Sequence, residues 1–296
     1  PVANGGTVVL GPGKLYIVKN TQARYDACKW GASTLPRHVG IVGAGTGQTG
    51  IAIAPGSIGY GIANAGASNS TAYAADEKIL LEGFSLYGNR SYQTGGVQLG
   101  GVIYNVPLSA SWFTNVDCYA TMDNLVISQF LSDGLTMHGR GESHISRLWL
   151  MNNSNRGLYT NGVQDTRFSS INAGGNGWAG FYCYDNASCS FNHCKSFYNG
   201  VGGGTDIYKT CNWYIGDGGH SYVKGTTMYT DCEAQESRGS GWLIEGGLNS
   251  FSNIKSSDPR RTPIGSNPRP SPAAALHIRG NGSNNTFSNF SCCPSL

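Results

Sequence analysis

Charged side chains are scarce in this chain, in which 20 Lys and Arg and 17 Asp and Glu make up only 12% of 296 residues. The formal net charge is +3 and the basic residues are scattered, so the composition does not indicate a nucleic-acid partner. No apolar run approaches the roughly 18 residues that a membrane-spanning helix needs, so no membrane partner is predicted. No secretory signal peptide is visible at Pro1, which leaves cytosolic synthesis and a processed or truncated chain both open.

Motifs for several common chemistries are also missing. The sequence has no Ser-His-Asp nucleophile elbow, no phosphate-binding loop and no Cys-His nucleophile arrangement. Its nine cysteines match no zinc pattern, and a core of this size does not need a disulfide scaffold, so reduced thiols are predicted. Calcium would suit closely spaced carboxylates, but no EF-hand-like Asp loop supports it, and no cofactor or metal is predicted.

Glycine, by contrast, is abundant at 44 residues, and it accompanies a repeat that organises the chain from Met122 to Phe290. Each repeat begins with an apolar residue, two mostly small or polar residues, and a second apolar residue or Cys. These pairs are Met122/Leu125, Ile145/Leu148, Phe168/Ile171, Phe191/Cys194, Tyr229/Cys232, Phe251/Ile254 and Phe287/Phe290. The first three steps are 23 residues each, and two of the later repeats carry insertions.

A second pattern follows in each of the first six repeats. Its positions alternate between apolar and polar or aromatic residues, which is typical of a strand with one buried face. The segments are GLTMHG (134–139), GLYTNG (157–162), GFYCYD (180–185), NWYIGD (212–217), GWLIEG (241–246) and ALHIRG (275–280). Short strands with Gly and Asn turns at this period describe coils of a solenoid, and the Gly and Asn density excludes helical repeats. We therefore predict an all-β parallel β-helix of roughly ten coils.

Other segments are fitted around these coils as one domain over residues 1–296. Residues 7–18 are predicted to form an opening strand, a Gly-Pro-Gly turn and a return strand. An earlier coil is predicted from LLEGFSL (80–86) and GGVQLGG (95–101), with Leu81/Phe84 as its core pair. Small polar residues just before the second core residue predict a turn that hydrogen-bonds along the stack. Loop excursions are predicted near 19–37, 52–77, 102–119, 198–211 and 256–274, the second with one short strand.

The first fifty residues carry a family resemblance. GGTVVLGPGKLYIV (5–18) and HVGIVGAGTGQTGI (38–51) resemble the first coils of right-handed parallel β-helices of the pectate-lyase superfamily, most of all the branch used in phage tailspikes and related polysaccharide-degrading proteins. That branch commonly forms trimers, so the resemblance implies a polysaccharide ligand, a homo-trimer or a larger virion assembly, and a tail-associated or extracellular location. The family's capping helix is missing and both ends appear bare, which suggests a missing cap or a partner chain.

Stacked coils place equivalent residues above one another, so the alignment predicts columns on the outer face of the second strands. One column consists of Thr136, Tyr159, Tyr182, Tyr214, Leu243 and His277. The next column consists of His138, Asn161, Tyr184, Gly216, Glu245 and Arg279. Aromatic rings with polar tips suit sugar faces, so we predict that Tyr159, Tyr182, Tyr184, Tyr214, His138 and Arg279 bind substrate on an exposed face. Stacked tyrosines that only stabilise the solenoid or a subunit contact remain the alternative.

Acid–base chemistry needs two titrating groups within reach of one bond. Asp217, His220 and Glu245 fall at the ends of second strands in consecutive coils, and we predict Glu245 as general acid, Asp217 as base or nucleophile and His220 as the group that orients it. A Gly-Asp-Gly-Gly turn plus a surface salt bridge between Glu245 and Arg279 is the alternative. A second cluster of Asp231, Glu233 and Glu236 is predicted to be a charge ladder, because Glu233 aligns between Lys195 and Lys255.

The leading hypothesis is therefore a tailspike-like protein that binds and depolymerises a surface polysaccharide by hydrolysis or β-elimination. The alternatives are a non-catalytic structural or adhesion β-helix of a viral tail or capsid, and a secreted polysaccharide lyase. The sequence does not name the sugar.

Overall fold

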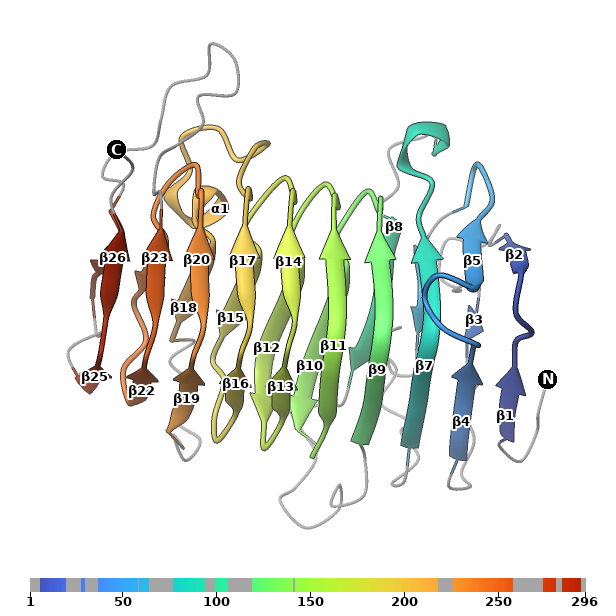
Figure 1. Ribbon diagram of the computed structural model, residues 1–296, viewed down its shortest axis with the longest axis horizontal. Coiled ribbons are helices and arrows are strands. Elements are labelled where there is room, and N and C mark those ends of the chain that lie inside the picture. Colours follow the sequence, from blue (N-terminus) through green and yellow to red (C-terminus); the bar gives the residue numbers. More distant parts are fainter. Residues whose placement is uncertain are drawn as a thin grey trace.

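The computed structural model describes residues 6–19, 28–29, 37–57, 59–63, 77–93, 99–105, 119–140, 142–217, 226–257, 274–280 and 284–293. These residues form a parallel β-helix whose coils follow one another along the long axis of the molecule (Figure 1). A 17-stranded sheet and a nine-stranded sheet wrap one continuous core, and every strand pair is parallel. The predicted fold is confirmed. No helix among the described residues is long and apolar enough to span a membrane.

The 17-stranded sheet has two arms. The first arm contains ten strands, one for each coil, in agreement with the predicted number of coils: β1 (Gly6–Val9), β4 (Arg37–Val42), β7 (Glu77–Tyr87), β9 (Tyr119–Ser128), β11 (His144–Met151), β13 (Arg167–Ser169), β16 (Ser190–Asn192), β19 (Thr227–Thr230), β22 (Asn249–Ser252) and β25 (Thr286–Ser288). The second arm consists of the later halves of β7, β9 and β11 together with β2 (Lys14–Val18), β5 (Thr49–Ile53), β14 (Asn172–Gly174), β17 (Lys195–Phe197), β20 (Glu233–Gln235), β23 (Lys255–Ser257) and β26 (Ser291–Cys293).

The nine-stranded sheet closes each coil and carries the second strands of the sequence repeat. Its members are β3 (Cys28–Lys29), β6 (Gly59–Ala63), β8 (Leu99–Asn105), β10 (Leu135–Arg140), β12 (Leu158–Gln164), β15 (Phe181–Tyr184), β18 (Trp213–Gly216), β21 (Trp242–Ile244) and β24 (Leu276–Ile278). The two described helices, η2 (Arg90–Tyr92) and α1 (Ile207–Thr210), lie in connections between strands.

A single residue with positive φ bends each coil between the two arms. Asn124, Ser170 and Asp231 have φ of 51°, 53° and 52°, as predicted for a turn just before the second core residue. Asn and Asp tolerate this left-handed conformation because their side chains hydrogen-bond locally. The column also hydrogen-bonds along the stack: Asn289 Nδ2 donates to Asn253 Oδ1 at 2.9 Å. The turn chemistry is therefore repeated once per coil.

The interior contains stacked side chains from successive coils. The predicted stack of second core residues is fully buried and is confirmed: Leu125, Leu148, Ile171, Cys194, Cys232 and Ile254. The first core positions of the later coils form a column of parallel rings, with Phe168–Phe191 centroids at 4.4 Å and Phe191–Tyr229 at 5.0 Å. Trp213 and Trp242 stack at 4.7 Å beside them. Large rings thus fill the later coils, where each first-arm strand is only three or four residues long.

Buried asparagines connect the coils at the corner between the second arm and the nine-stranded sheet. Asn153 Nδ2 donates to Asn176 Oδ1 at 3.1 Å, and Asn176 Nδ2 donates to Asn199 Oδ1 at 2.9 Å. Asn199 Nδ2 continues the chain of amides to Asn212 Oδ1 at 3.0 Å. Because backbone N–H groups of the corner also donate to these oxygens, the ladder satisfies polar groups that the turn would otherwise leave unpaired inside the protein.

The structure corrects two sequence predictions at the N-terminal coils. Strand β2 does not return beside β1, because β1 pairs with β4 whereas β2 pairs with β5. The Gly-Pro-Gly segment between them is therefore a corner within one coil. The second strand of the coil containing Leu81 is β8 rather than 95–101, since Val102 pairs with Leu135. A run of glycines fits both registers, and only the pairing with β10 distinguishes them.

The predicted excursions have different outcomes. β6 is the short strand predicted within 52–77, and β3 lies within 19–37. The excursion at 102–119 was placed too early, because 102–105 belongs to β8 and residues 106–118 lie outside the described residues. Residues 198–211 form a turn and α1, whereas 258–273 of the last excursion lie outside the described part of the chain.

Candidate functional site

The outer face of the nine-stranded sheet contains the predicted tyrosine column. Tyr159 pairs in register with Tyr182, and Tyr182 pairs with Tyr214. Their ring centroids lie 5.7 Å and 4.4 Å apart, and the ring of His138 extends the series at 5.3 Å from Tyr159. We call these three tyrosines the tyrosine row. The in-register pairing of β12, β15 and β18 holds them on one face at the spacing of the coils.

The row is not uniformly exposed, which corrects the sequence prediction. Tyr159 and Tyr182 are half-buried, but Tyr214 is only 5% exposed and Leu243 beside it is fully buried. Both pack with Ala179 and Cys211 in a small cluster on the outside of the sheet, against the segment that contains α1. The alternation of apolar and polar residues correctly predicted which face of the sheet carries the tyrosines. It could not show that the segment containing α1 covers Tyr214 and Leu243 on that face.

The α1 segment is fixed by its own polar contacts. Asp206 caps the helix, since its Oδ1 accepts from the Tyr208 backbone N–H at 2.9 Å, and its other oxygen lies 3.2 Å from Lys209 Nζ. The Tyr208 ring then meets Tyr214 edge to face at 5.3 Å. Gly216 makes room for this arrangement, because a Cβ there would lie 2.5 Å from the Tyr214 hydroxyl.

Glu245 is the carboxylate at this end of the row. Tyr208 donates to its Oε1 at 3.1 Å and Tyr214 donates to its Oε2 at 3.2 Å. The Arg279 Nε lies 3.7 Å from Oε1, which is the salt bridge that the sequence analysis gave as the alternative to a catalytic role. Both oxygens thus have hydrogen-bond donors from α1 and β18. The sequence did not single out Tyr208, because nothing in its own segment predicts that α1 folds back over β18.

The phenols of Tyr182 and Tyr214 stay protonated over a wide pH range. Burial raises the pKa of Tyr182 to about 12, although the nearby Arg156 opposes this shift. Burial also raises the pKa of Tyr214 well above its ordinary value, and Glu245 adds to the effect. Each hydroxyl can therefore donate a hydrogen bond throughout the physiological range.

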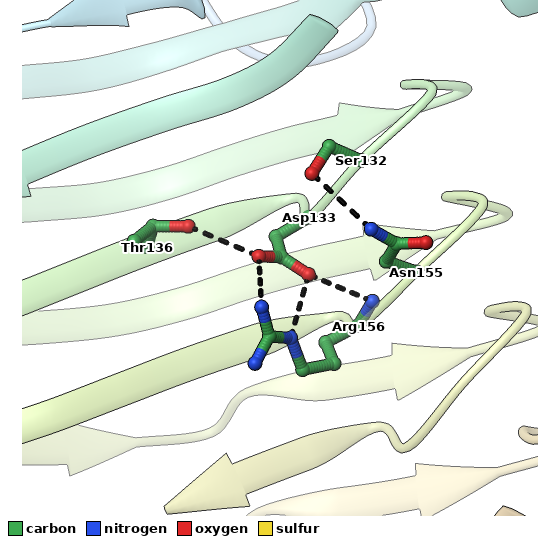
Figure 2. A network of polar contacts seen from close by, with 5 residues as sticks. All are labelled: Ser132, Asp133, Thr136, Asn155 and Arg156. Atoms are coloured by element: carbon green, nitrogen blue, oxygen red, sulfur yellow. Dashed lines mark hydrogen bonds and ion pairs between the residues drawn. The ribbon is translucent and has the colours of Figure 1, made fainter. Parts of the chain in front are cut away.

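An ion pair at the other end of the row was missed by the sequence analysis. Asp133 and Arg156 precede equivalent strands in adjacent coils and lie one 23-residue step apart. Arg156 Nε and Nη2 each donate to one oxygen of Asp133 at 2.8 Å, as Figure 2 shows. Thr136 and the Arg156 backbone N–H supply further donors to the same carboxylate. The opposite charges at aligned positions were the available signal.

Arg156 also contacts the aromatic rings. Its guanidinium carbon lies 3.7 Å from the centroid of Tyr159, 5.1 Å from that of Tyr182 and 5.7 Å from that of Trp178. A cation over the face of an aromatic ring is attracted by the ring quadrupole. Burial first and the charge of Arg156 second lower the pKa of His138, so this imidazole is neutral at neutral pH.

Of the other predicted residues, Tyr184 packs against the cluster that contains Tyr214 and Leu243, whereas Asp217 lies at a different place. Asp217 follows β18 and borders a cavity of about 30 Å³ that Cys183 and Tyr229 line from inside the coil. Glu245 instead contacts the rings on the outer side of the sheet. His220 lies outside the described residues, so the pairing of Asp217 with Glu245 and His220 stays a proposal. The described residues contain no group of three or more His, Cys, Asp or Glu that could hold a metal ion.

Within the second acidic cluster, Glu233 has the predicted ladder geometry, whereas Glu236 is buried. Glu233 lies 3.4 Å from Lys195 Nζ on one side and 3.4 Å from Lys255 Nζ on the other, on the outer face of the second arm. Its Oε1 also accepts from the Ser257 hydroxyl at 2.9 Å. These are the contacts of a charge ladder on a solvated face.

Comparisons with known proteins bear on the fold. No family model and no curated protein matches the chain in sequence. Among solved structures, it is similar to ORF18 of Geobacillus virus E2, with a TM-score of 0.61 and 13% identity over 99% of this chain and 54% of that one. It is also similar to the enzymatically active domain of bacteriophage CBA120 tailspike protein 2 (TM-score 0.56, 13% identity, 96% of this chain and 38% of that one). Pectate lyase Pel9A gives a TM-score of 0.53 and 15% identity over 98% of this chain and 71% of that one.

These identities show a shared fold and no more. The resemblance inferred from the first fifty residues is thereby confirmed at the level of the β-helix. The chain spans about half the length of the Geobacillus virus E2 protein and a smaller share of the CBA120 tailspike domain.

Proposed function

We propose that this protein binds a polysaccharide along the tyrosine row, in the manner of a phage tailspike. The observation that supports it best is the series of rings from His138 to Tyr182, held at the coil spacing on one outer face and left half-exposed. Aromatic faces pack on sugar rings, and the phenol hydroxyls can donate to and accept from sugar hydroxyls. Phage tailspike proteins and a pectate lyase among the structures with the same fold are consistent with this ligand class.

Binding is tested on a panel of bacterial capsular and plant polysaccharides with the wild-type protein and with Tyr159→Ala and Tyr182→Ala. Each variant is expected to lose at least about tenfold in affinity, because each removes one stacking face. The matched control is Trp149→Ala, which removes an exposed ring from β11 on the 17-stranded sheet. Equal losses for all three variants, or no binding by the wild type, would overturn the proposal.

Cleavage of the bound chain is a second proposal, supported by Glu245 at the end of the row. Glu245 is proposed as general acid and Asp217 as base or nucleophile, with His220 orienting Asp217 and Arg279 binding an anionic group of the sugar. Released reducing ends without the ultraviolet absorbance of unsaturated uronates indicate hydrolysis, and both signals together indicate elimination. If neither signal appears while binding is observed, the protein is an adhesion β-helix without a catalytic step.

Assembly and location follow from the same proposal. A tail-associated or extracellular β-helix that binds surface polysaccharide is expected to act as a homo-trimer or within a larger virion assembly. Multi-angle light scattering at micromolar concentration tests this expectation, and a stable monomer would contradict it.

A further inference from the structure

The Asp133–Arg156 ion pair also orients the Arg156 guanidinium relative to the tyrosine row. Asp133 is buried, and its two oxygens accept from Arg156 Nε and Nη2, from the Arg156 backbone N–H and from Thr136. This acid therefore has no free acceptor for a ligand. Its effect is to fix the plane of the guanidinium over Tyr159.

One edge of that guanidinium remains available. Nε and Nη2 face Asp133, whereas Nη1 points away from the carboxylate and has no hydrogen-bond partner among the described residues (Figure 2). The Arg156 side chain is 16% exposed, so solvent or a ligand can reach it. Nη1 carries two N–H donors and no acceptor.

A second cation lies beside the same rings. Lys209 Nζ lies 4.7 Å from the ring centroid of Trp178. The guanidinium carbon of Arg156 lies 5.7 Å from the same centroid. Lys209 comes from α1 and Arg156 from the corner before β12, so the insertion and the regular coil both bring positive charge to this ring. The charged groups that face a ligand here are hydrogen-bond donors, because Asp133 is saturated and Asp206 already accepts from Tyr208 and Lys209.

We propose that Arg156 is the specificity-determining residue of the row and that it binds the carboxylate of an acidic sugar. Charge-assisted hydrogen bonds from a guanidinium to a carboxylate are stronger than those to a neutral hydroxyl. The guanidinium is already ordered by Asp133 and by the rings, so little further side-chain entropy is lost on binding. The inference rests on the proposed polysaccharide function, which it narrows to carboxylate-bearing chains.

The first test needs no variant. Wild-type protein is titrated with uronate polysaccharides, including polygalacturonate and alginate, with the carboxyl-reduced form of each and with neutral dextran. Reduction turns the carboxylate into a hydroxymethyl group and leaves the backbone of the polysaccharide in place. We expect affinity for at least one acidic chain to fall at least about tenfold on reduction, the change that loss of one charge-assisted hydrogen bond produces.

The second test uses Asp133→Asn with Arg156→Gln, a double variant that removes both charges together so that neither is left buried alone. It should bind the acidic chain at least about tenfold more weakly than the wild type and the reduced chain equally well. Arg156→Lys keeps the positive charge but removes the planar guanidinium with its fixed N–H donors, and it should bind the acidic chain with intermediate affinity. The matched control, Asp123→Asn with Arg147→Gln, removes a bidentate pair from the other sheet and should bind like the wild type.

The outcomes separate this inference from the proposed function. Equal binding of acidic and reduced chains, binding of dextran alone, or an unchanged acidic affinity in a folded double variant would each overturn the role of Arg156 while the polysaccharide function stands. Absence of binding to every chain would overturn both.

Discussion

Asn176 donates from its side-chain amide to Oδ1 of Asn199 at 2.9 Å, one coil further along the molecule. Its own Oδ1 accepts from both the backbone and the side chain of Asn153, and its Nδ2 also donates to the Leu150 carbonyl at 3.0 Å. All of these groups are buried. The ladder is therefore a continuous hydrogen-bond chain inside the corner, in which each member depends on its neighbours.

Asn176→Ala is expected to lower the free energy of unfolding by about 3 kcal/mol or more. The substitution leaves several buried polar groups unpaired, and each such group costs roughly 1–3 kcal/mol. Urea unfolding followed by circular dichroism measures the change. Asn155→Ala is the control, since this half-buried amide makes a single 3.3 Å hydrogen bond to Ser132 and should cost less than about 1 kcal/mol. Equal costs for both variants would contradict the ladder's role.

The bend residue Ser170, with φ of 53°, predicts a substitution pattern opposite to that of a strand position. Ser170→Gly should be neutral or stabilising, because glycine adopts this conformation without steric cost. Ser170→Val should lower the free energy of unfolding by about 1–2 kcal/mol, since a β-branched residue strains there. Ser169→Val, one residue earlier on β13, should be tolerated. Thermal unfolding of the three variants measures this contrast, which should vanish if the bend is not left-handed.

Glu233 predicts an acid-dependent loss of stability. Burial raises the pKa of this carboxyl, but the Ser257 hydroxyl, Lys195 and Lys255 outweigh burial and hold it below its ordinary value of 4.5. The unfolded chain then takes up the proton first as pH falls, so Glu233 stabilises the fold above about pH 4.5 and this contribution is lost as pH falls through the lower folded-state pKa. The stability of Glu233→Gln should therefore fall less steeply than that of the wild type below pH 4.5. Parallel profiles in urea titrations between pH 3 and 7 would contradict the prediction.

The described cysteines should separate into two reactivity classes. Cys292 and Cys293 are exposed, whereas five others are buried: Cys183, Cys189, Cys194, Cys211 and Cys232. Burial raises the pKa of the Cys189 thiol to about 12, so almost none of it is thiolate at neutral pH. Iodoacetamide labelling of native protein, located by mass spectrometry, should modify the two exposed residues and spare the five buried ones until denaturant is added. Native labelling of a buried thiol would show that the coil opens locally.

Glu245 is tested by kinetics once a cleaved polysaccharide is found. Glu245→Gln should lower the rate by at least about 100-fold, as loss of a general acid does, without unfolding the solenoid. The control is Glu233→Gln, which neutralises a carboxylate on the opposite face and should keep the wild-type rate. A fully active Glu245→Gln protein would remove Glu245 from the reaction and move the search to other carboxylates near the row.

The repeat in the sequence predicted the register of the later coils correctly because stacking equivalent residues is the only way for each short coil to bury its apolar side chains. The pairing of Tyr159 with Tyr182, and of Glu233 with both Lys195 and Lys255, follows directly from the alignment. The prediction failed at β8, where consecutive glycines carry no signal for register. The predicted roles of Asp217 and His220 remain predictions.

The sequence by itself determined the solenoid, its buried stack and the face on which the tyrosines lie, because the period of two and the coil spacing are local properties of the chain. Only the tertiary structure decided which part of that face is open. The α1 segment buries Tyr214, and Tyr208 reaches Glu245 across 37 positions of sequence. The path of an insertion depends on the surface that it meets after folding, and no periodicity within the insertion encodes that surface.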